Sequence, residues 1–271
     1  DMKNKLLLMV VVVLTIILLI EIKTPKKEIQ NNKNNNNQEE IKVKNVATGA
    51  IETKDLENYV IGVVAAEMPA SFSIEALKAQ AIASRSYAYY KMKQNNGNYD
   101  IIADVSNQAY INDDEMHEKW QEDYDIYYKK IKEAVDGTKN EVMTYDGQVI
   151  EAFYFAMSNG YTTTSLSVFN EELPYLNNIL PTLDSPNTKL FQVTKTFSKT
   201  QFCETLNINC THLKITNIIT DNSNRVEILS INDTQYTGID IRKKFNLRST
   251  DFTIEEDNEN IIFTTKGYGH G

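Results

Sequence analysis

Residues 59–92 read YVIGVVAAEMPASFSIEALKAQAIASRSYAYYKM, and the rest of the chain is organised around this stretch. Leu56, Val60 and Val63 recur at the three- and four-residue steps that place side chains on one face of a helix. Pro69 disfavours helical geometry at the residue before it, so the first helix is predicted to end there. A second, longer helix is predicted after the break.

Two features of this stretch point to a site. Glu67 lies at the end of the first helix, directly after an apolar run. On the second helix, which Ser73 is expected to cap, Gln80, Ser84 and Tyr87 are spaced at i, i+4 and i+7 and therefore share one face. An acid that faces a polar stripe forms one half of a candidate active site. The alternative interpretation is a solvated glutamate beside the outer face of an amphipathic helix.

The segment AAEMPASFSIEALKAQAIASRSYA, residues 65–88, resembles the signature of the stage II sporulation protein D family of peptidoglycan lytic transglycosylases, which also includes amidase enhancers. The resemblance continues in order as far as the end of the chain. It is carried by EVMTYDGQVIEAFYF (141–155), SNGYT (158–162), LPYL (173–176), TGIDIRKKFNLRSTDF (237–252) and GYGHG (267–271).

The resemblance implies an enzyme with a single catalytic acid, which is Glu67 in this chain. Such an enzyme cleaves the bond between N-acetylmuramic acid and N-acetylglucosamine in glycan strands without stem peptides, and it leaves a 1,6-anhydro sugar. We expect the substrate to be held by the second helix and by the loop around Asn159. The expected substrate-binding residues are Lys78, Gln80, Ser84, Arg85, Tyr87, Ser158, Asn159 and Gly160, with His270 as a further polar group.

The resemblance also implies a place in sporulation. Family members of this type act as the mother-cell membrane engulfs the forespore. Their partners are an amidase/endopeptidase that removes stem peptides and a membrane protein of the same complex. No cofactor is implied.

This chain departs from the family pattern in three places. Many relatives carry His-Ser-x-Ser-Gly-Gly where this chain has FAMSNG (155–160), so the role of that histidine is in doubt. Some relatives carry a His and Cys cluster after the second helix, but residues 100–110 contain neither residue type, so we predict no metal. The family continues past the terminal GYGHG into a last helix, so we expect a C-terminal truncation.

The first residues predict a membrane anchor. Leu6 to Ile20 form an apolar run interrupted by Thr15, and lysines precede it, as in a secretory signal. No cleavage pattern of small residues follows, so residues 1–22 are interpreted as an uncleaved, single-pass signal-anchor with the catalytic domain outside the cytoplasm. Residues 23–40 are rich in Asn, Gln, Lys and Glu and predict a disordered linker.

Residues 41–271 are predicted to form the extracytoplasmic domain, of α+β class. The two signature helices would form a helical core. Alternating apolar residues predict a strand at IKVKNV (41–46), and Asp146-Gly147 predicts the turn of a hairpin over residues 141–155. One long helix is expected from Asp113 to Gly137, capped by Asp113 or Asp114. Further strands are expected at LKITNIIT, RVEILSIN and IIFTTKG, with short helices at residues 197–206 and after Thr237.

Charge and cysteine content limit the remaining possibilities. The formal net charge of −9 argues against a nucleic-acid partner. Cys203 and Cys210 have six residues between them, which permits a disulfide in an exported protein and equally permits two free thiols. Their spacing does not match a zinc ribbon.

Two other functions remain open. One is a glycan-binding enhancer of a cell-wall amidase, in which Glu67 is structural. The other is a hydrolase that delivers water with a second carboxylate such as Asp104 or Asp251. Glycoside hydrolases usually use two carboxylates, but no second acid lies in an evident motif near Glu67.

Overall fold

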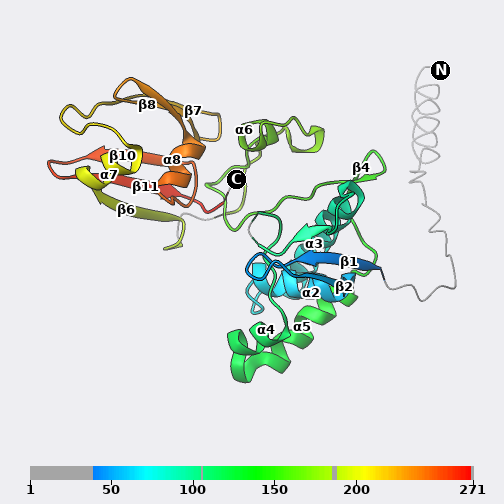
Figure 1. The fold of residues 1–271 in the computed structure, drawn as a ribbon. Helices are drawn as coiled ribbons and strands as arrows, with labels where there is room; N and C mark the ends of the chain where they lie inside the picture. Colours follow the sequence, from blue (N-terminus) through cyan, green and yellow to red (C-terminus); the bar gives the residue numbers. More distant parts are fainter. Residues whose placement is uncertain (1–38, 105, 185–187, 270–271) are drawn as a thin grey trace, which may run out of the picture. The chain divides into compact units, whose positions relative to one another are not determined.

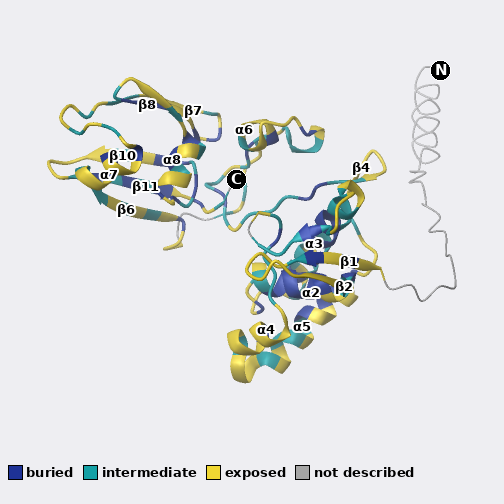
Figure 2. Cartoon of the chain, in the orientation of Figure 1, coloured by how far each residue is buried: buried dark blue, intermediate teal, exposed yellow. Residues whose placement is uncertain are grey.

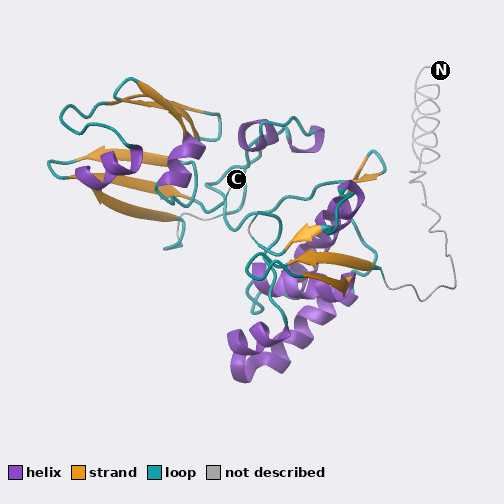
Figure 3. Cartoon of the chain, in the orientation of Figure 1, coloured by secondary structure: helices purple, strands orange, loops and turns teal. Residues whose placement is uncertain are grey.

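The computed structural model describes residues 39–104, 106–184 and 188–269. The predicted anchor at residues 1–22, nearly all of the predicted linker and His270 lie outside the described residues. The described part is of mixed α+β class, as predicted, with helices and mainly antiparallel sheets (Figures 1 and 3). Within it, no helix is both long and apolar enough to span a membrane.

The elements follow one another in two groups. The first group contains β1 (Glu40–Lys44), β2 (Ile51–Asp55), α2 (Leu56–Glu67), α3 (Ile74–Gln94), β3 (Ile101–Ile102), α4 (Asp113–Trp120), α5 (Tyr124–Asp136), β4 (Thr144–Tyr145), β5 (Gln148–Val149) and α6 (Ser165–Phe169). The second contains β6 (Gln192–Ser198), α7 (Lys199–Leu206), β7 (Ile215–Thr220), β8 (Val226–Ile231), β9 (Thr234–Thr237), α8 (Gly238–Lys244), β10 (Phe252–Glu256) and β11 (Asn260–Lys266).

The first hydrophobic core lies among α2, α3 and α5, which pack against one another beside the sheet β2-β1-β3 (Figure 1). Ile41 and Val43 alternate with exposed residues along β1 and are buried, which confirms the predicted half-buried strand. Figure 2 shows α2 as the most continuously buried helix of this group. Its residues from Tyr59 to Ala65 are all buried, so the apolar run before Glu67 is core.

The break between α2 and α3 forms as predicted. Met68 leaves the helix with extended backbone angles (φ −128°, ψ 137°) in front of Pro69. The Ser73 hydroxyl then accepts a hydrogen bond from the Ala76 N–H (3.3 Å) and caps α3. The break therefore ends α2 at Glu67 and leaves this carboxylate at the rim of the core.

The prediction of one long helix from Asp113 to Gly137 is wrong. α4 and α5 are separate helices with a short 3-10 turn (Gln121–Asp123) between them. Gln121 has a positive φ of 47°, which is incompatible with a continuous helix. The cap is Asn112, whose side chain accepts the Glu115 N–H while Glu115 bonds back to the Asn112 N–H. α5 has a buried face, on which Ile131 and Val135 are fully buried.

The hairpin predicted over residues 141–155 is shorter than expected. Only β4 and β5 pair, around the Asp146-Gly147 turn in which both residues have positive φ. Residues 151–155 leave the ladder as irregular chain. This departure carries Phe153 and Tyr154 back to α3.

A second hydrophobic core lies between the sheets β10-β11-β6 and β7-β8-β9 and the helices α7 and α8. Phe197, Phe202, Phe245 and Phe263 form a cluster of ring contacts at its centre. Cys203 and Cys210 are joined by a disulfide, which settles the question that the sequence left open.

Candidate functional site

Glu67 lies at the surface, but protein surrounds one side of its carboxyl group. Its Oε1 accepts a hydrogen bond from the backbone N–H of Ala109 at 3.2 Å. Burial raises the pKa of Glu67, and hydrogen bonds from the Ala109 N–H and the Tyr154 hydroxyl oppose part of this rise. The residue as a whole is exposed. A carboxylic acid that is open to solvent on one side and desolvated on the other is suited to donate a proton to a bound molecule.

A chain of hydrogen bonds links Glu67 to α3. The Gln108 side chain is 1% exposed, and its Nε2 donates to the Tyr154 hydroxyl (3.1 Å) and to the Ser84 carbonyl (3.2 Å). Its Oε1 accepts from the Tyr59 hydroxyl at 3.2 Å. With its donors and acceptor engaged, Gln108 holds Tyr154 in a fixed position beside Glu67.

The face predicted on α3 is part of this cluster. Gln80 Nε2 donates to Ser84 Oγ at 3.0 Å. The Ser84 side chain also interacts with the Tyr154 hydroxyl and lowers its pKa, against larger upward effects of burial and of the Glu67 charge. Ser84 is fully buried and Tyr87 is 5% exposed, whereas Gln80 is only half-buried. Ser84 and Tyr87 therefore position other groups, and Gln80 is the member of the stripe that solvent reaches.

Arg85 was expected to hold substrate, but the structure places it inside the first core. It is fully buried, and its guanidinium forms two hydrogen bonds to the carboxylate of Glu57, at 2.7 and 2.9 Å. It also donates to the carbonyls of Val135 and Glu141. A buried charge needs such partners, and these leave no donor facing the Glu67 side of α3. Arg85 joins α2, α3 and the end of α5.

Lys78 and the loop at residues 158–160 contact residues other than those of the Glu67 cluster. Lys78 forms a surface ion pair with Glu75 at 2.9 Å. Ser158 is buried, and its N–H donates to Asp184. The Asn159 side chain donates to the Ser223 carbonyl (2.6 Å) and to the Asp251 carboxylate (2.7 Å).

Gly160 completes this loop with a φ of +106°, in the region that favours glycine. Its N–H donates to Ser158 Oγ, and its carbonyl accepts from the Thr182 N–H. The bonds of residues 158–160 thus fasten neighbouring loops together. The expectation that they contact substrate beside Glu67 has no support in these contacts.

Sequence reasoning missed three groups at the site, namely Gln108, the Ala109 N–H and Tyr154. Gln108 and Ala109 belong to a segment for which no binding role was predicted, and Tyr154 belongs to the expected hairpin. No spacing rule connects residue 154 with residue 67, since their approach depends on the chain leaving the β4–β5 ladder. The one available signal was polar and aromatic residues, SNQAYI, between two predicted helices.

The two carboxylates considered as partners of Glu67 are engaged elsewhere. Asp104 accepts hydrogen bonds from the Ser106 side chain and backbone, which hold its pKa below the usual value. Asp251 is buried, which raises its pKa, and it bonds to Asn159. Among the described residues, no group of three or more His, Cys, Asp or Glu is arranged to hold a metal ion.

Comparison with known proteins identifies the family. Residues 44–145 match the family model described as "Stage II sporulation protein". The chain is 36% identical over 238 residues to stage II sporulation protein D of Bacillus subtilis, covering 85% of this chain and 69% of that protein.

The chain belongs to the stage II sporulation protein D family.

A second family member, from Bacillus amyloliquefaciens, is 35% identical over the same shares of both chains. The amidase enhancer of B. subtilis is 34% identical over 115 residues, which are 42% of this chain and 14% of that protein. The match to the stage II sporulation protein model includes Glu67, the α3 stripe and Gln108, and it ends before Tyr154. Membership connects this chain with sporulation.

Proposed function

We propose that this sporulation protein is a peptidoglycan lytic transglycosylase that uses Glu67 as its single general acid and base. The observation that supports this most is the raised pKa of an exposed glutamate at the edge of a buried polar network. The substrate would be glycan strands without stem peptides, cleaved between N-acetylmuramic acid and N-acetylglucosamine.

The reaction needs one carboxyl group in two protonation states. Protonated Glu67 gives its proton to the glycosidic oxygen, and the bond from this oxygen to C1 of the muramyl residue breaks. The muramyl C6 hydroxyl then attacks C1 and its proton passes to the Glu67 carboxylate. The products are a 1,6-anhydro muramyl end and a new free hydroxyl on the leaving sugar, so the acid is regenerated and no water is consumed.

The surroundings of Glu67 favour this single-acid chemistry over a two-carboxylate hydrolase. Among the described residues, the groups that shift the pKa of Glu67 are the Ala109 N–H and the Tyr154 hydroxyl, together with burial, and neither group is a carboxylate. An inverting or retaining hydrolase needs its second carboxyl group within about 5–10 Å of the first. The two carboxylates considered for that role, Asp104 and Asp251, form their hydrogen bonds with Ser106 and Asn159.

The cluster also supplies the two conditions that such an acid needs. Burial favours the protonated form at the start of the reaction. The Ala109 N–H and the Tyr154 hydroxyl then stabilise the carboxylate that forms as the proton leaves. Gln80 is the side chain from α3 that we assign to substrate contact, with Ser84 and Gln108 positioning Tyr154.

The remaining expectations belong to the same proposal. We propose a signal-anchor at residues 1–22, a linker at 23–40 and a catalytic domain at 41–271 that faces the forespore from the mother-cell membrane. Its proposed partners are an amidase/endopeptidase that strips the glycan and a membrane protein of the engulfment complex.

A second function is favoured by the resemblance to the amidase enhancer. In that case the protein binds glycan and stimulates an amidase, and the Glu67 network is structural. The two functions differ in one property, since only the first yields cleaved strands when no other enzyme is present.

The deciding experiment is mass spectrometry of peptide-free glycan strands incubated with the full chain in detergent. We expect 1,6-anhydro muramyl ends from the parent protein and a rate lower by at least about 100-fold with Glu67→Gln, because general acid–base catalysis contributes about 10²–10⁴-fold. Asp104→Asn is the matched control and should keep the parent rate.

Three results would redirect the proposal. Product formation by Glu67→Gln at the parent rate would exclude Glu67 as the acid. Reducing ends would indicate a hydrolase. A folded parent that binds the strands without cleaving them would favour the enhancer.

A further inference from the structure

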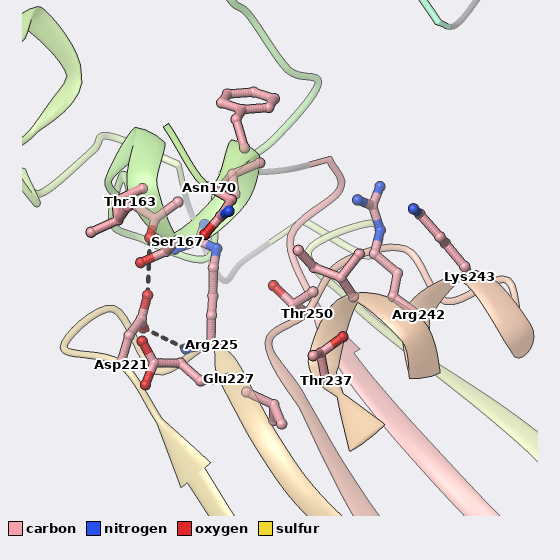
Figure 4. A pocket seen from close by; sticks show the side chains of 15 residues that line it. Thr163, Ser167, Asn170, Asp221, Arg225, Glu227, Thr237, Arg242, Lys243 and Thr250 are labelled. Atoms are coloured by element: carbon pink, nitrogen blue, oxygen red, sulfur yellow. Dashed lines mark hydrogen bonds between the residues drawn. The ribbon is translucent and has the colours of Figure 1, made fainter. Parts of the chain in front are cut away.

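A cavity lies in a part of the chain separate from Glu67. It has a volume of about 540 Å³ and lies between α6 and the β8–β9–α8 segment (Figure 4). Leu166, Val168 and Val226 contribute to an apolar part of its wall. Such a volume is in the range of small-molecule sites, which are mostly apolar with a few placed polar groups.

The polar part of this wall includes three cationic side chains. Arg242 and Lys243 project from α8 at one side, and Arg225 stands beside Ser167 at another (Figure 4). Asp221 and Glu227 also line the cavity. Asp221 is already engaged, because Thr163 Oγ1, Ser223 Oγ and the Arg225 N–H donate to it. Glu227 is exposed.

Arg225 has an unused donor. Its side chain is buried, with the residue 4% exposed, and its two terminal nitrogens donate to Ser223 Oγ (2.8 Å) and to the Tyr161 carbonyl (3.1 Å). Its Nε is the one buried side-chain polar atom of the described residues that lacks a hydrogen-bond partner. An unsatisfied buried donor is costly, so a ligand acceptor in the cavity would remove a penalty that the free protein carries.

Arg242 is the second cationic side chain of the wall that is partly withdrawn from solvent. Burial lowers its pKa, and the opposing effect comes from Tyr268 and from no carboxylate of the described residues. Its guanidinium is planar and matches a carboxylate with two parallel hydrogen bonds. The cavity therefore combines an apolar wall with two largely buried guanidinium groups, and Arg225, although it lies near Asp221 and Asp251, keeps an Nε without a hydrogen-bond partner.

We propose that this cavity binds a carboxylate that carries a short aliphatic body. The carboxylate would bond to Arg242 and to the Nε of Arg225, and the aliphatic body would lie against Leu166 and Val226. Two components of a cell wall have this chemistry, namely the lactyl group of a muramic acid without its peptide and the end of a stem peptide. The site is separate from Glu67, and its ligand binding does not depend on the proposed cleavage.

The test is isothermal titration calorimetry of the full chain in detergent, in a Glu67→Gln background that prevents turnover. The probes are N-acetylmuramic acid and N-acetyl-D-alanyl-D-alanine, with N-acetylglucosamine as the uncharged control. We expect saturable binding of at least one carboxylate and none of the uncharged sugar. Binding of the first probe would assign the lactyl group, and binding of the second would assign the peptide end.

Variants locate the binding. Arg242→Gln should weaken it by about tenfold or more, since hydrogen bonds to charged groups contribute about 1.5–3 kcal/mol and 1.4 kcal/mol is a factor of ten. Lys244, the last residue of α8, does not line the cavity. Lys244→Gln removes the same charge as Arg242→Gln and should change the affinity by less than about twofold. Leu166→Ala, at an exposed position of the wall, should also weaken binding.

The proposal fails if neither carboxylate binds, or if both variants of α8 bind equally well. It also fails if the uncharged sugar binds as tightly as the carboxylates. Cleavage of glycan by the parent chain is unaffected by any of these results, so failure here is distinct from failure of the transglycosylase proposal.

Discussion

Glu67 is the proposed general acid, and the pH dependence of its protonation gives the first test of this role. Its pKa in the folded protein is raised, so the folded state holds the proton more tightly than the unfolded state does. The stability that this provides is present below the unfolded pKa and falls as the pH rises through the window up to the folded pKa. Catalysis requires the same protonated form, so activity and this part of the stability should decline together toward higher pH.

Tyr154→Phe tests the network around that acid. The Tyr154 hydroxyl lowers the pKa of Glu67, so its removal should raise this pKa and shift the high-pH limb of kcat/KM upward. We expect the limb to move to higher pH, because the hydrogen bond that is lost favours the charged form of Glu67.

Tyr87→Phe is the matched control, since the Tyr87 hydroxyl interacts with Lys91 and Asn107. In Tyr87→Phe the high-pH limb of kcat/KM should lie at the same pH as in the parent, even if the rate itself changes. A limb that moves downward or stays fixed in Tyr154→Phe would contradict the assignment.

At the scale of elements, the site depends on how closely α2 meets the loop that carries Gln108 and Ala109. Gly62 makes this contact possible. A Cβ placed there would lie 2.3 Å from the Tyr110 ring and 2.7 Å from the Ile111 carbonyl oxygen. The Ile111 N–H also donates to the Gly62 carbonyl (3.3 Å), which fixes the loop against the helix.

Gly62→Ala should therefore destabilise the protein and disturb the site. Alanine favours a helix over glycine by about 1 kcal/mol, but overpacking a core costs about 1–3 kcal/mol, so we expect a net loss of stability. The displaced loop should weaken the bond from Ala109 to Glu67 and reduce glycan cleavage. Urea unfolding and the cleavage rate measure the two effects, and a variant with higher stability and unchanged rate would contradict this packing.

Much of the element structure was predictable from local signals, while the contacts between elements were not. The Pro69 break, the Ser73 cap and the buried face of α5 all follow from spacing and capping rules. The positive φ of Gln121, which divides the expected long helix, has no such signal. Arg85 shows the same limit, because sequence gives its charge and helix position but not the Glu57 carboxylate that it meets inside the core.

At the scale of the whole described chain there are two hydrophobic cores, and each of the two proposed sites lies beside one of them. The Glu67 network lies on the first core, and the cavity with Arg242 lies beside the second. The Cys203–Cys210 disulfide belongs to the second core. Sequence could place the two cysteines close together, but not the aromatic cluster on which they pack.

Replacing both cysteines with alanine should lower the stability of the second core and leave the chemistry at Glu67 intact. For a loop with a sequence separation of seven, the chain-entropy estimate is about 2–3 kcal/mol. Thermal unfolding measures the loss, and the cleavage rate below the transition should stay within about twofold of the parent. Loss of cleavage by a folded double variant would show that the second core takes part in the reaction.

The central claim is that Glu67 closes the muramyl C6 hydroxyl onto C1 without water. The most direct measurement is cleavage of peptide-free glycan strands in ¹⁸O-labelled water, followed by mass spectrometry of the new muramyl ends. We predict 1,6-anhydro ends that contain no solvent oxygen, formed by the parent and lost in Glu67→Gln. Muramyl ends that carry one ¹⁸O atom would contradict it, because they require water as the nucleophile and a second group to activate it.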